Sequence, residues 1–238
     1  MKDLKPLDWI LICGVSLTSL ACLFVESITL NSLALKSIEE ISPMDWVGLI
    51  AGVSGVCCVV LVAKRKIINY LFGIVNVSLY AYISYRSQIW GDAFLNACYY
   101  FPMQFLGWWQ WSRNRESSGR EDTVKAKRMS LAGRLWLFAG CAVSVLATGL
   151  VLKYFTSDPQ PFKDAATTVL SIIAQFLMVR IFMEQWFLWI TTNVLSVVMW
   201  SILWANGSSE ALLMVVMWLF YLANSINGLL VWNRASKR

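Results

Sequence analysis

The chain has 238 residues, of which 58% are apolar and only 14% are charged. A soluble globular domain carries about 25% charged residues, so this composition excludes an ordinary soluble fold. The charged residues lie in short breaks between long apolar runs, which is typical of a chain that crosses a membrane. We therefore expect a single membrane domain over residues 1–238.

Eight apolar segments are long enough to cross a bilayer, which requires about 20 residues of helix. They cover residues 9–30, 44–63, 67–85, 91–112, 131–152, 164–182, 184–204 and 209–232. The first segment is too long for the apolar part of a signal peptide, so we expect it to remain as a membrane helix. The sequence therefore predicts an all-α polytopic membrane protein with eight transmembrane helices.

Lysine and arginine are unevenly divided between the loops on the two sides of this predicted domain. With eight spans, 16 of the 20 basic residues fall on one side, together with both termini. Loops rich in these residues stay in the cytoplasm, which predicts cytoplasmic termini and a cytoplasmic basic loop at 113–128. This bias accounts for the net charge of +6. A nucleic-acid partner is not expected, because such a loop ordinarily faces anionic lipid.

Two stretches of three predicted helices resemble each other: 44–112 and 164–232. At an offset of 117 residues, Asn76 aligns with Asn193. After a loop that is four residues longer in the second stretch, Trp111 aligns with Trp232 at an offset of 121. The similarity of the two stretches predicts an internal repeat.

Corresponding helices of the repeat lie four spans apart, so the two repeats point the same way across the membrane. The helix at 131–152 joins them, and the helix at 9–30 lies outside them. This gives a 3+1+3 arrangement with one extra N-terminal helix. Parallel repeats of this kind are found in transporters, with the solute site at the repeat interface near the membrane midplane.

Neutral amide side chains lie at mid-depth in five predicted helices: Asn76, Gln104, Gln175, Asn193 and Asn224. A primary amide in hydrocarbon is costly without partners, and a single one usually holds two helices together. Five of them, two at aligned repeat positions, favour a shared polar cavity. No charged residue or histidine lies near the centre of a span. This argues against proton or sodium coupling through a buried carboxylate and favours a facilitator.

Aromatic side chains share the helical faces of these amides. Three stripes at helical spacing result: Tyr100, Gln104 and Trp108; Trp186, Trp189 and Asn193; Tyr221 and Asn224. Aromatic rings stack on a flat solute or bind a cation through their faces, while amides hydrogen-bond its edges. Tryptophans at helix ends can instead mark the lipid interface, and Trp186 fits either description. The stripes favour a flat aromatic solute that is uncharged or singly cationic.

Clusters of residues that carry enzyme chemistry are missing from the sequence. The chain has no histidine, and its six cysteines lie in apolar runs without CxxC spacing. A metal site, a cofactor or a nucleophile–base pair is therefore not predicted, and we do not expect an enzyme. A purely structural membrane protein is a weaker alternative, because it would not need five amides at mid-depth.

The pattern Trp186-x-x-Trp189-x-x-x-Asn193 resembles the tryptophan–tryptophan–asparagine signature of the PnuC family of bacterial vitamin-precursor transporters. Asn76 with Tyr80, and the Gly-Trp-Trp-Gln-Trp run that ends the fourth helix, add to the resemblance. It implies a facilitator of nicotinamide riboside in the bacterial inner membrane, with a fold similar to that of SWEET sugar transporters. It also implies a homotrimer and a cytoplasmic kinase that traps the solute by phosphorylation.

The resemblance and the stripes together predict a solute site at the repeat interface. Its predicted residues are Trp189, Asn193, Asn76, Gln104, Tyr100, Tyr221, Asn224, Trp186, Tyr80, Trp108 and, near an access path, Gln88. Nicotinamide riboside is a flat cation with a carboxamide and a ribose, which suits amides and aromatic rings. A phosphorylated nucleotide would need interior Lys or Arg. Thiamine, riboflavin or another nucleoside stays open as the alternative solute of this family.

Overall fold

A computed structural model describes residues 6–28, 33–35, 37–115, 123–156, 160–206 and 211–237. Its helices are α1 (Pro6–Phe24), α2 (Pro43–Ala63), α3 (Asn69–Arg86), α4 (Trp90–Phe94), α5 (Phe101–Arg113), α6 (Leu131–Phe155), α7 (Pro161–Val179), α8 (Gln185–Ala205) and α9 (Ala211–Ala235). A π-helical segment (Leu95–Tyr100) joins α4 to α5, and a 3₁₀ turn (Ile38–Glu40) precedes α2. Helix makes up most of each of the eight expected spans, which confirms the expected helical membrane architecture.

The first expected helix, 9–30, is too long. Helix α1 ends at Phe24, and the chain continues as strand β1 (Val25–Ile28), which pairs antiparallel with β2 (Leu33–Leu35). The β-branched residues of β1 favour this extended backbone. Because the apolar run continues through it, hydropathy alone does not show where the helix ends and the strand begins. Residues 29 and 30 of the expected span lie outside the described residues, as do residues 209 and 210 of the last one.

The expected span 91–112 is not one continuous α-helix. It consists of α4, the π-helical segment and α5, and Pro102 lies in the first turn of α5. Proline has no N–H to donate to the carbonyl four residues earlier. Just before it, the Phe101 N–H donates to the Asn96 carbonyl, five residues back. This wider turn is a π-bulge, a feature that is frequent at functional sites.

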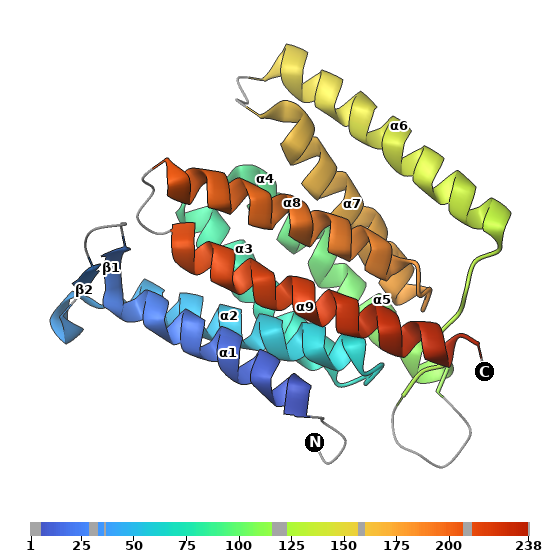
Figure 1. The fold of residues 1–238 in the computed structure, drawn as a ribbon, viewed down its shortest axis with the longest axis horizontal. Coiled ribbons are helices and arrows are strands. Elements are labelled where there is room, and N and C mark those ends of the chain that lie inside the picture. The colour runs from blue at the N-terminus through green and yellow to red at the C-terminus, as the bar shows by residue number, and fades with distance from the viewer. Residues whose placement is uncertain are drawn as a thin grey trace.

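Five helices in the described part of the chain are long and apolar enough to cross a membrane: α2, α6, α7, α8 and α9. Figure 1 shows the helices of the bundle packed side by side, with the start of α1 and the end of α9 at the same end of it. Helix α6 lies at the edge and packs against α7. This arrangement is that of a multi-pass membrane protein, as the composition predicts.

Helix α1 lies against α2 and α9. Leu11 and Val15 pack there in a small apolar cluster. At the start of α1, the buried Asp8 carboxylate lies 2.7 Å from Lys64 Nζ, where α2 ends. The same carboxylate accepts a hydrogen bond of 3.4 Å from the Asn227 amide on α9. Helix α1 is therefore connected through polar contacts to both α2 and α9 rather than to a single neighbour.

The last turns of α2 and α7 accept hydrogen bonds from tryptophans in the opposite half of the chain. The Trp111 indole N–H on α5 donates to the Met178 carbonyl of α7 at 2.9 Å. The Trp232 indole N–H on α9 donates to the Val62 carbonyl of α2, also at 2.9 Å. Carbonyls in the last turn of a helix lack the usual partner four residues on. Each half of the chain therefore completes a helix end in the other half.

Four buried aromatic side chains join the two halves beside these hydrogen bonds. The ring centroids lie 5.2 Å apart for Tyr70 and Trp111, 5.7 Å for Trp111 and Trp232, and 6.1 Å for Trp232 and Trp186. The Tyr70 and Trp186 pairs are edge-to-face, an arrangement that the charge distribution of aromatic rings favours. We refer to these four residues as the aromatic cluster.

The turn between α2 and α3 has the same backbone hydrogen bonds as the turn between α7 and α8. In both, an N–H donates to the carbonyl five residues earlier, from Lys66 to Leu61 and from Phe182 to Leu177. The two turns also have the same length. The two halves of the chain therefore reverse direction in the same way at this point.

Each of these turns contains one residue with left-handed backbone, Arg65 with φ 61° and Ile181 with φ 67°. Such a conformation is unfavourable for a β-branched residue such as isoleucine, so tertiary contacts must maintain it. The two turns align at an offset of 116 residues, one fewer than the sequence alignment gives. At this offset Thr192, not Asn193, corresponds to Asn76.

Candidate functional site

Polar side chains from three helices converge on one face of α2. The Asn76 amide on α3 donates to the Ala51 carbonyl at 2.8 Å, and the Asn224 amide on α9 donates to the Val59 carbonyl at 3.1 Å. Between them lies Gly55. The Asn76 nitrogen is 2.7 Å, and the Tyr221 hydroxyl 3.6 Å, from the point that a Cβ at Gly55 would occupy. Because Gly55 has no side chain, the Asn76 amide and the Tyr221 hydroxyl can approach the backbone of α2.

Gln104 reaches the same region from α5. Its Nε2 donates to the Tyr100 carbonyl at 3.1 Å within the same chain segment. Its Oε1 faces Gly73 on α3, close to the Cys58 thiol on α2. Four of the predicted residues, Asn76, Gln104, Tyr221 and Asn224, therefore surround the central part of α2.

Two amide oxygens in this region have no hydrogen-bond partner in the described part of the protein. Gln104 is 4% exposed and Asn224 2% exposed, yet Gln104 Oε1 and Asn224 Oδ1 remain unpaired. Leaving such an acceptor buried and unpaired costs about 1–3 kcal/mol. Hydroxyl or amide hydrogens of a bound solute are the partners that this chemistry accepts.

Asn193 lies on α8, where its amide donates to the Ser225 hydroxyl of α9 at 2.8 Å. Ser225 directly follows Asn224, so α9 joins this pair to the groups around α2. Trp189 lies one turn before Asn193, is only partly buried, and packs against two apolar clusters. The Thr192 hydroxyl, 4% exposed, has no partner among the described residues. We refer to the groups around α2 and this pair together as the polar cluster.

The remaining predicted residues lie elsewhere. Trp186 belongs to the aromatic cluster, where its ring covers Gly228. Tyr100 is turned toward α7, where its hydroxyl meets the Ser171 side chain. Tyr80, Trp108 and Gln88 are exposed, and Gln88 lies in the turn after α3.

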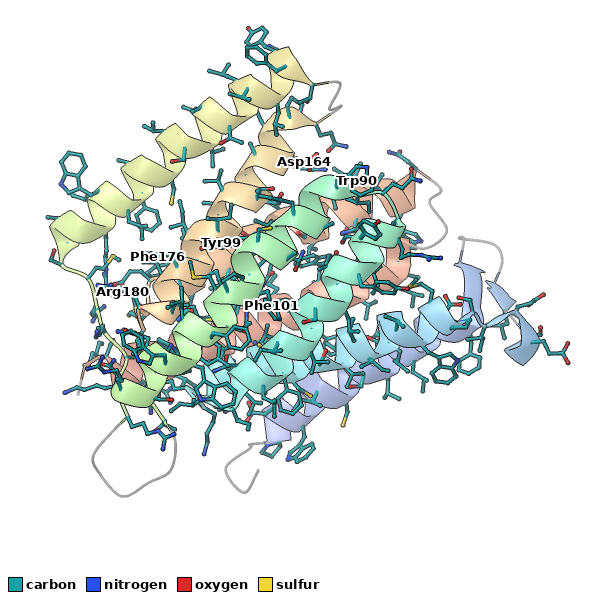
Figure 2. The ribbon with its side chains drawn as sticks, turned by 180° about the vertical axis from the view of Figure 1, so that it is seen from behind. Trp90, Tyr99, Phe101, Asp164, Phe176 and Arg180 are labelled. Atoms are coloured by element: carbon teal, nitrogen blue, oxygen red, sulfur yellow. The ribbon has the colours of Figure 1, made fainter. Side chains whose placement is uncertain are left out.

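The neighbouring Tyr99 also links to α7. Its hydroxyl donates to the Ile172 carbonyl at 2.7 Å, and Figure 2 shows it where the π-helical segment crosses α7. Phe101 and Phe176, labelled in the same view, are exposed on the outer face of these helices. The π-helical segment therefore turns its two tyrosines to α7, while Gln104, at the next turn, points to α2 and α3.

Sequence reasoning missed several groups of the polar cluster. Ser225 and Thr192 are small hydroxyl residues inside apolar helices, where they ordinarily bond to their own backbone. Gly55 and Gly73 carry no chemistry themselves, but they are the positions where amides approach another helix. The two glycines at mid-depth of predicted helices were the signal in the sequence for this close approach, since small residues let membrane helices come close.

Residues 45–234 match the model of a family described as nicotinamide mononucleotide transporter. A nicotinamide riboside transporter PnuC from Neisseria mucosa is 37% identical over 199 residues, which is 83% of this chain and 75% of the relative. One from Haemophilus influenzae is 33% identical over 83% of each chain. A crystal structure of the vitamin B3 transporter PnuC is similar with a TM-score of 0.74 and 31% identity, over 100% of this chain and 95% of the other.

Proposed function

Because the chain belongs to the PnuC family of membrane transporters, we propose that it takes up nicotinamide riboside by facilitated diffusion. The resemblance expected from the tryptophan–asparagine pattern is thereby confirmed. The chain is a transporter and not an enzyme, as its family membership shows.

The polar cluster is the observation that carries the choice of solute. Its members are amides and hydroxyls, and none of the residues that form it is Lys or Arg. The unpaired oxygens of Gln104 and Asn224 match the donors of a carboxamide and of ribose hydroxyls. The family description mentions a mononucleotide, whose phosphate would require cationic partners. The cluster favours the riboside, and the partly buried Trp189 offers a ring face to its cationic pyridinium.

The proposal includes two parallel repeats, 44–112 and 164–232, joined by the linker helix 131–152 with the helix at 9–30 outside them. The reciprocal hydrogen bonds of Trp111 and Trp232, and the matching turns after α2 and α7, support this 3+1+3 organisation. Transport would proceed by rocking one three-helix unit against the other around the polar cluster.

The multi-pass protein is proposed to lie in the bacterial inner membrane with both termini in the cytoplasm. The 16-to-4 division of basic residues supports this orientation. A cytoplasmic kinase that phosphorylates the riboside would make uptake effectively one-way, because a charged phosphate ester does not fit the polar cluster. A homotrimer, implied by the family resemblance, is part of the same proposal.

Asn193→Ala tests the assignment of solute and site together. We expect the variant to bind nicotinamide riboside about tenfold more weakly or worse, because a lost hydrogen bond that leaves a buried group unpaired costs 1–3 kcal/mol. Binding is measured by calorimetry on purified protein and uptake in proteoliposomes. Thr191→Ala is the matched control, since Thr191 is exposed and its hydroxyl bonds only within α8.

Titration with thiamine, riboflavin and nicotinamide mononucleotide accompanies this experiment. Preference for one of these would keep the site and replace the solute. Equal binding of the riboside by wild type, Asn193→Ala and Thr191→Ala would show that the polar cluster is not the site.

Gln104→Met separates a binding role of Gln104 from a structural one. Methionine has a similar length and removes the unpaired buried oxygen, so we expect an unchanged or higher melting temperature in the solute-free protein. The same change removes an acceptor for the solute, so the riboside affinity should fall about tenfold. A lower melting temperature with unchanged affinity would mean that Gln104 serves packing alone.

A further inference from the structure

The part of the basic loop just before α6, residues 123–128, lies beside both left-handed turns. The Val124 N–H donates to the Arg65 carbonyl at 3.2 Å, and the Arg65 guanidinium donates back to the Val124 carbonyl at 2.6 Å. Three residues on, the Lys127 N–H donates to the Ile181 carbonyl at 2.8 Å, and the Met183 N–H donates to the Lys127 carbonyl at 2.9 Å. The segment is thus bonded to the turn after α2 and to the turn after α7.

A pocket of about 500 Å³ opens at this segment. Its lining residues are Asn114, Lys125, Ala126, Lys127, Arg128, Phe182 and Ser236. The pocket lies apart from the polar cluster, because none of its lining residues belongs to it. A volume of this size is ordinary for a small-molecule site.

The charges of the pocket are not neutralised within the protein that the structure describes. Lys125, Lys127 and Arg128 are exposed, and none of them forms a salt bridge with an acidic residue in that part of the chain. The nearby Glu184 is fully buried and already engaged by Arg134 and by the Met129 N–H. Among the residues that the structure describes, three cations therefore line one open pocket and none of them has an acidic partner.

We propose that this pocket binds a phosphate-bearing anion. Two ammonium groups and a guanidinium supply the charge and the hydrogen bonds that phosphate oxygens accept most strongly. Phe182 supplies one apolar wall, and the Asn114 and Ser236 side chains supply neutral polar groups. The phosphate belongs either to a soluble phosphate ester or to an anionic lipid headgroup, which share this chemistry.

Binding of an anion in the pocket would affect the two turns, because the stretch from Val124 to Lys127 is hydrogen-bonded to both of them. An anion held by Lys125 and Lys127 would make this stretch more rigid. It would thereby favour one arrangement of α2 and α3 relative to α7 and α8. This consequence rests on the proposed transport function, whereas the binding itself does not.

The binding test uses the full protein in a neutral detergent and a phosphate-free buffer. One arm titrates inorganic phosphate and adenosine monophosphate by calorimetry. The other arm compares a short-chain phosphatidylglycerol with the matching phosphatidylcholine by shift in melting temperature. We expect saturable binding in at least one arm. The K125Q/K127Q/R128Q variant should reduce the affinity about tenfold or more, because charge-assisted hydrogen bonds are lost.

The control variant is R113Q/R180Q/R234Q, which removes the same charge from exposed arginines at the same end of the bundle without touching the pocket. Retained binding in this control supports the pocket, and equal loss in both variants would reduce the effect to general electrostatics and overturn it. No preference for any phosphate compound in either arm would also overturn it. Binding confined to the ester arm or to the lipid arm identifies the source. Riboside uptake is measured separately, so failure of transport and failure of anion binding remain distinguishable.

Discussion

Gly228→Ala is expected to lower the melting temperature of the purified protein strongly. An alanine Cβ at this position of α9 would lie 2.4 Å from the ring of Trp186. That ring is 2% exposed and is backed by Trp232, so it has no room to move away. Overpacking of a rigid buried site costs about 1–3 kcal/mol, and the loss here should be at the upper end. Thermal unfolding in detergent, followed by intrinsic fluorescence, measures it.

Two further glycines make this prediction specific. Gly107→Ala should behave like Gly228→Ala, because its Cβ would lie 2.3 Å from the ring of the fully buried Tyr70. Gly140→Ala on α6 is the matched control, since nothing lies within 4 Å of its Cβ position. Alanine there should gain up to about 1 kcal/mol of helix propensity. Equal melting temperatures for all three variants would contradict the packing that the structure gives to the aromatic cluster.

Glu184→Ala is the second change for which we expect a large loss of stability. Glu184 Oε1 accepts hydrogen bonds from Arg134 Nε at 2.9 Å and from the Met129 N–H at 3.1 Å, and the side chain is fully buried. Removing one partner of a buried ion pair costs about 3–5 kcal/mol, and the 23% exposure of Arg134 reduces this to roughly 3 kcal/mol. Because Met129 also loses its partner, the segment before α6 should become more sensitive to protease.

Asp164→Asn provides the control for this ion pair. Asp164 lies 3.0 Å from Lys163 Nζ but is 44% exposed, and Figure 2 shows it at the opposite end of α7 from Arg180. An exposed pair contributes at most about 1 kcal/mol, so this variant should melt close to the wild type. In the Glu184→Ala, Arg134→Ala double variant the loss should be smaller than the sum of the single losses, because no unpaired charge remains. An additive double variant would show that the two groups do not interact.

Hydropathy predicts the helices of this protein well, because a chain in hydrocarbon must satisfy its backbone hydrogen bonds within each span. Each span therefore forms a helix and reads as one long apolar run. The end of α1 and the π-helical segment escaped prediction, since Val25–Ile28 continues the apolar run and Pro102 alone does not reveal a wider turn. The alignment of Asn76 with Asn193 was one residue out of step with the backbone. The sequence alignment was set by matching the two asparagines. The positions of the turns after α2 and α7, which give the offset of 116, become visible only in the structure.

The candidate site was predictable in its chemistry more than in its contacts. Amides at mid-depth must find partners, and the structure brings Asn76, Gln104 and Asn224 together around α2. Spacing alone does not separate Trp186 from Trp189, because both lie on one helical face. Their environments differ because Gly228 leaves room for the ring of Trp186, and the rotation of one helix relative to another is not encoded in periodicity.

The crossed tryptophan hydrogen bonds also set the order in which the molecule can be completed during synthesis. The Val62 carbonyl is made early, but its indole partner belongs to Trp232, six residues from the end of the chain. Trp111 likewise has to await Met178. A nascent chain that has inserted its first helices therefore still lacks the indole hydrogen bonds that join its two halves. A chain that ended before residue 232 would never tie the end of α2 to α9, however many helices it already contained.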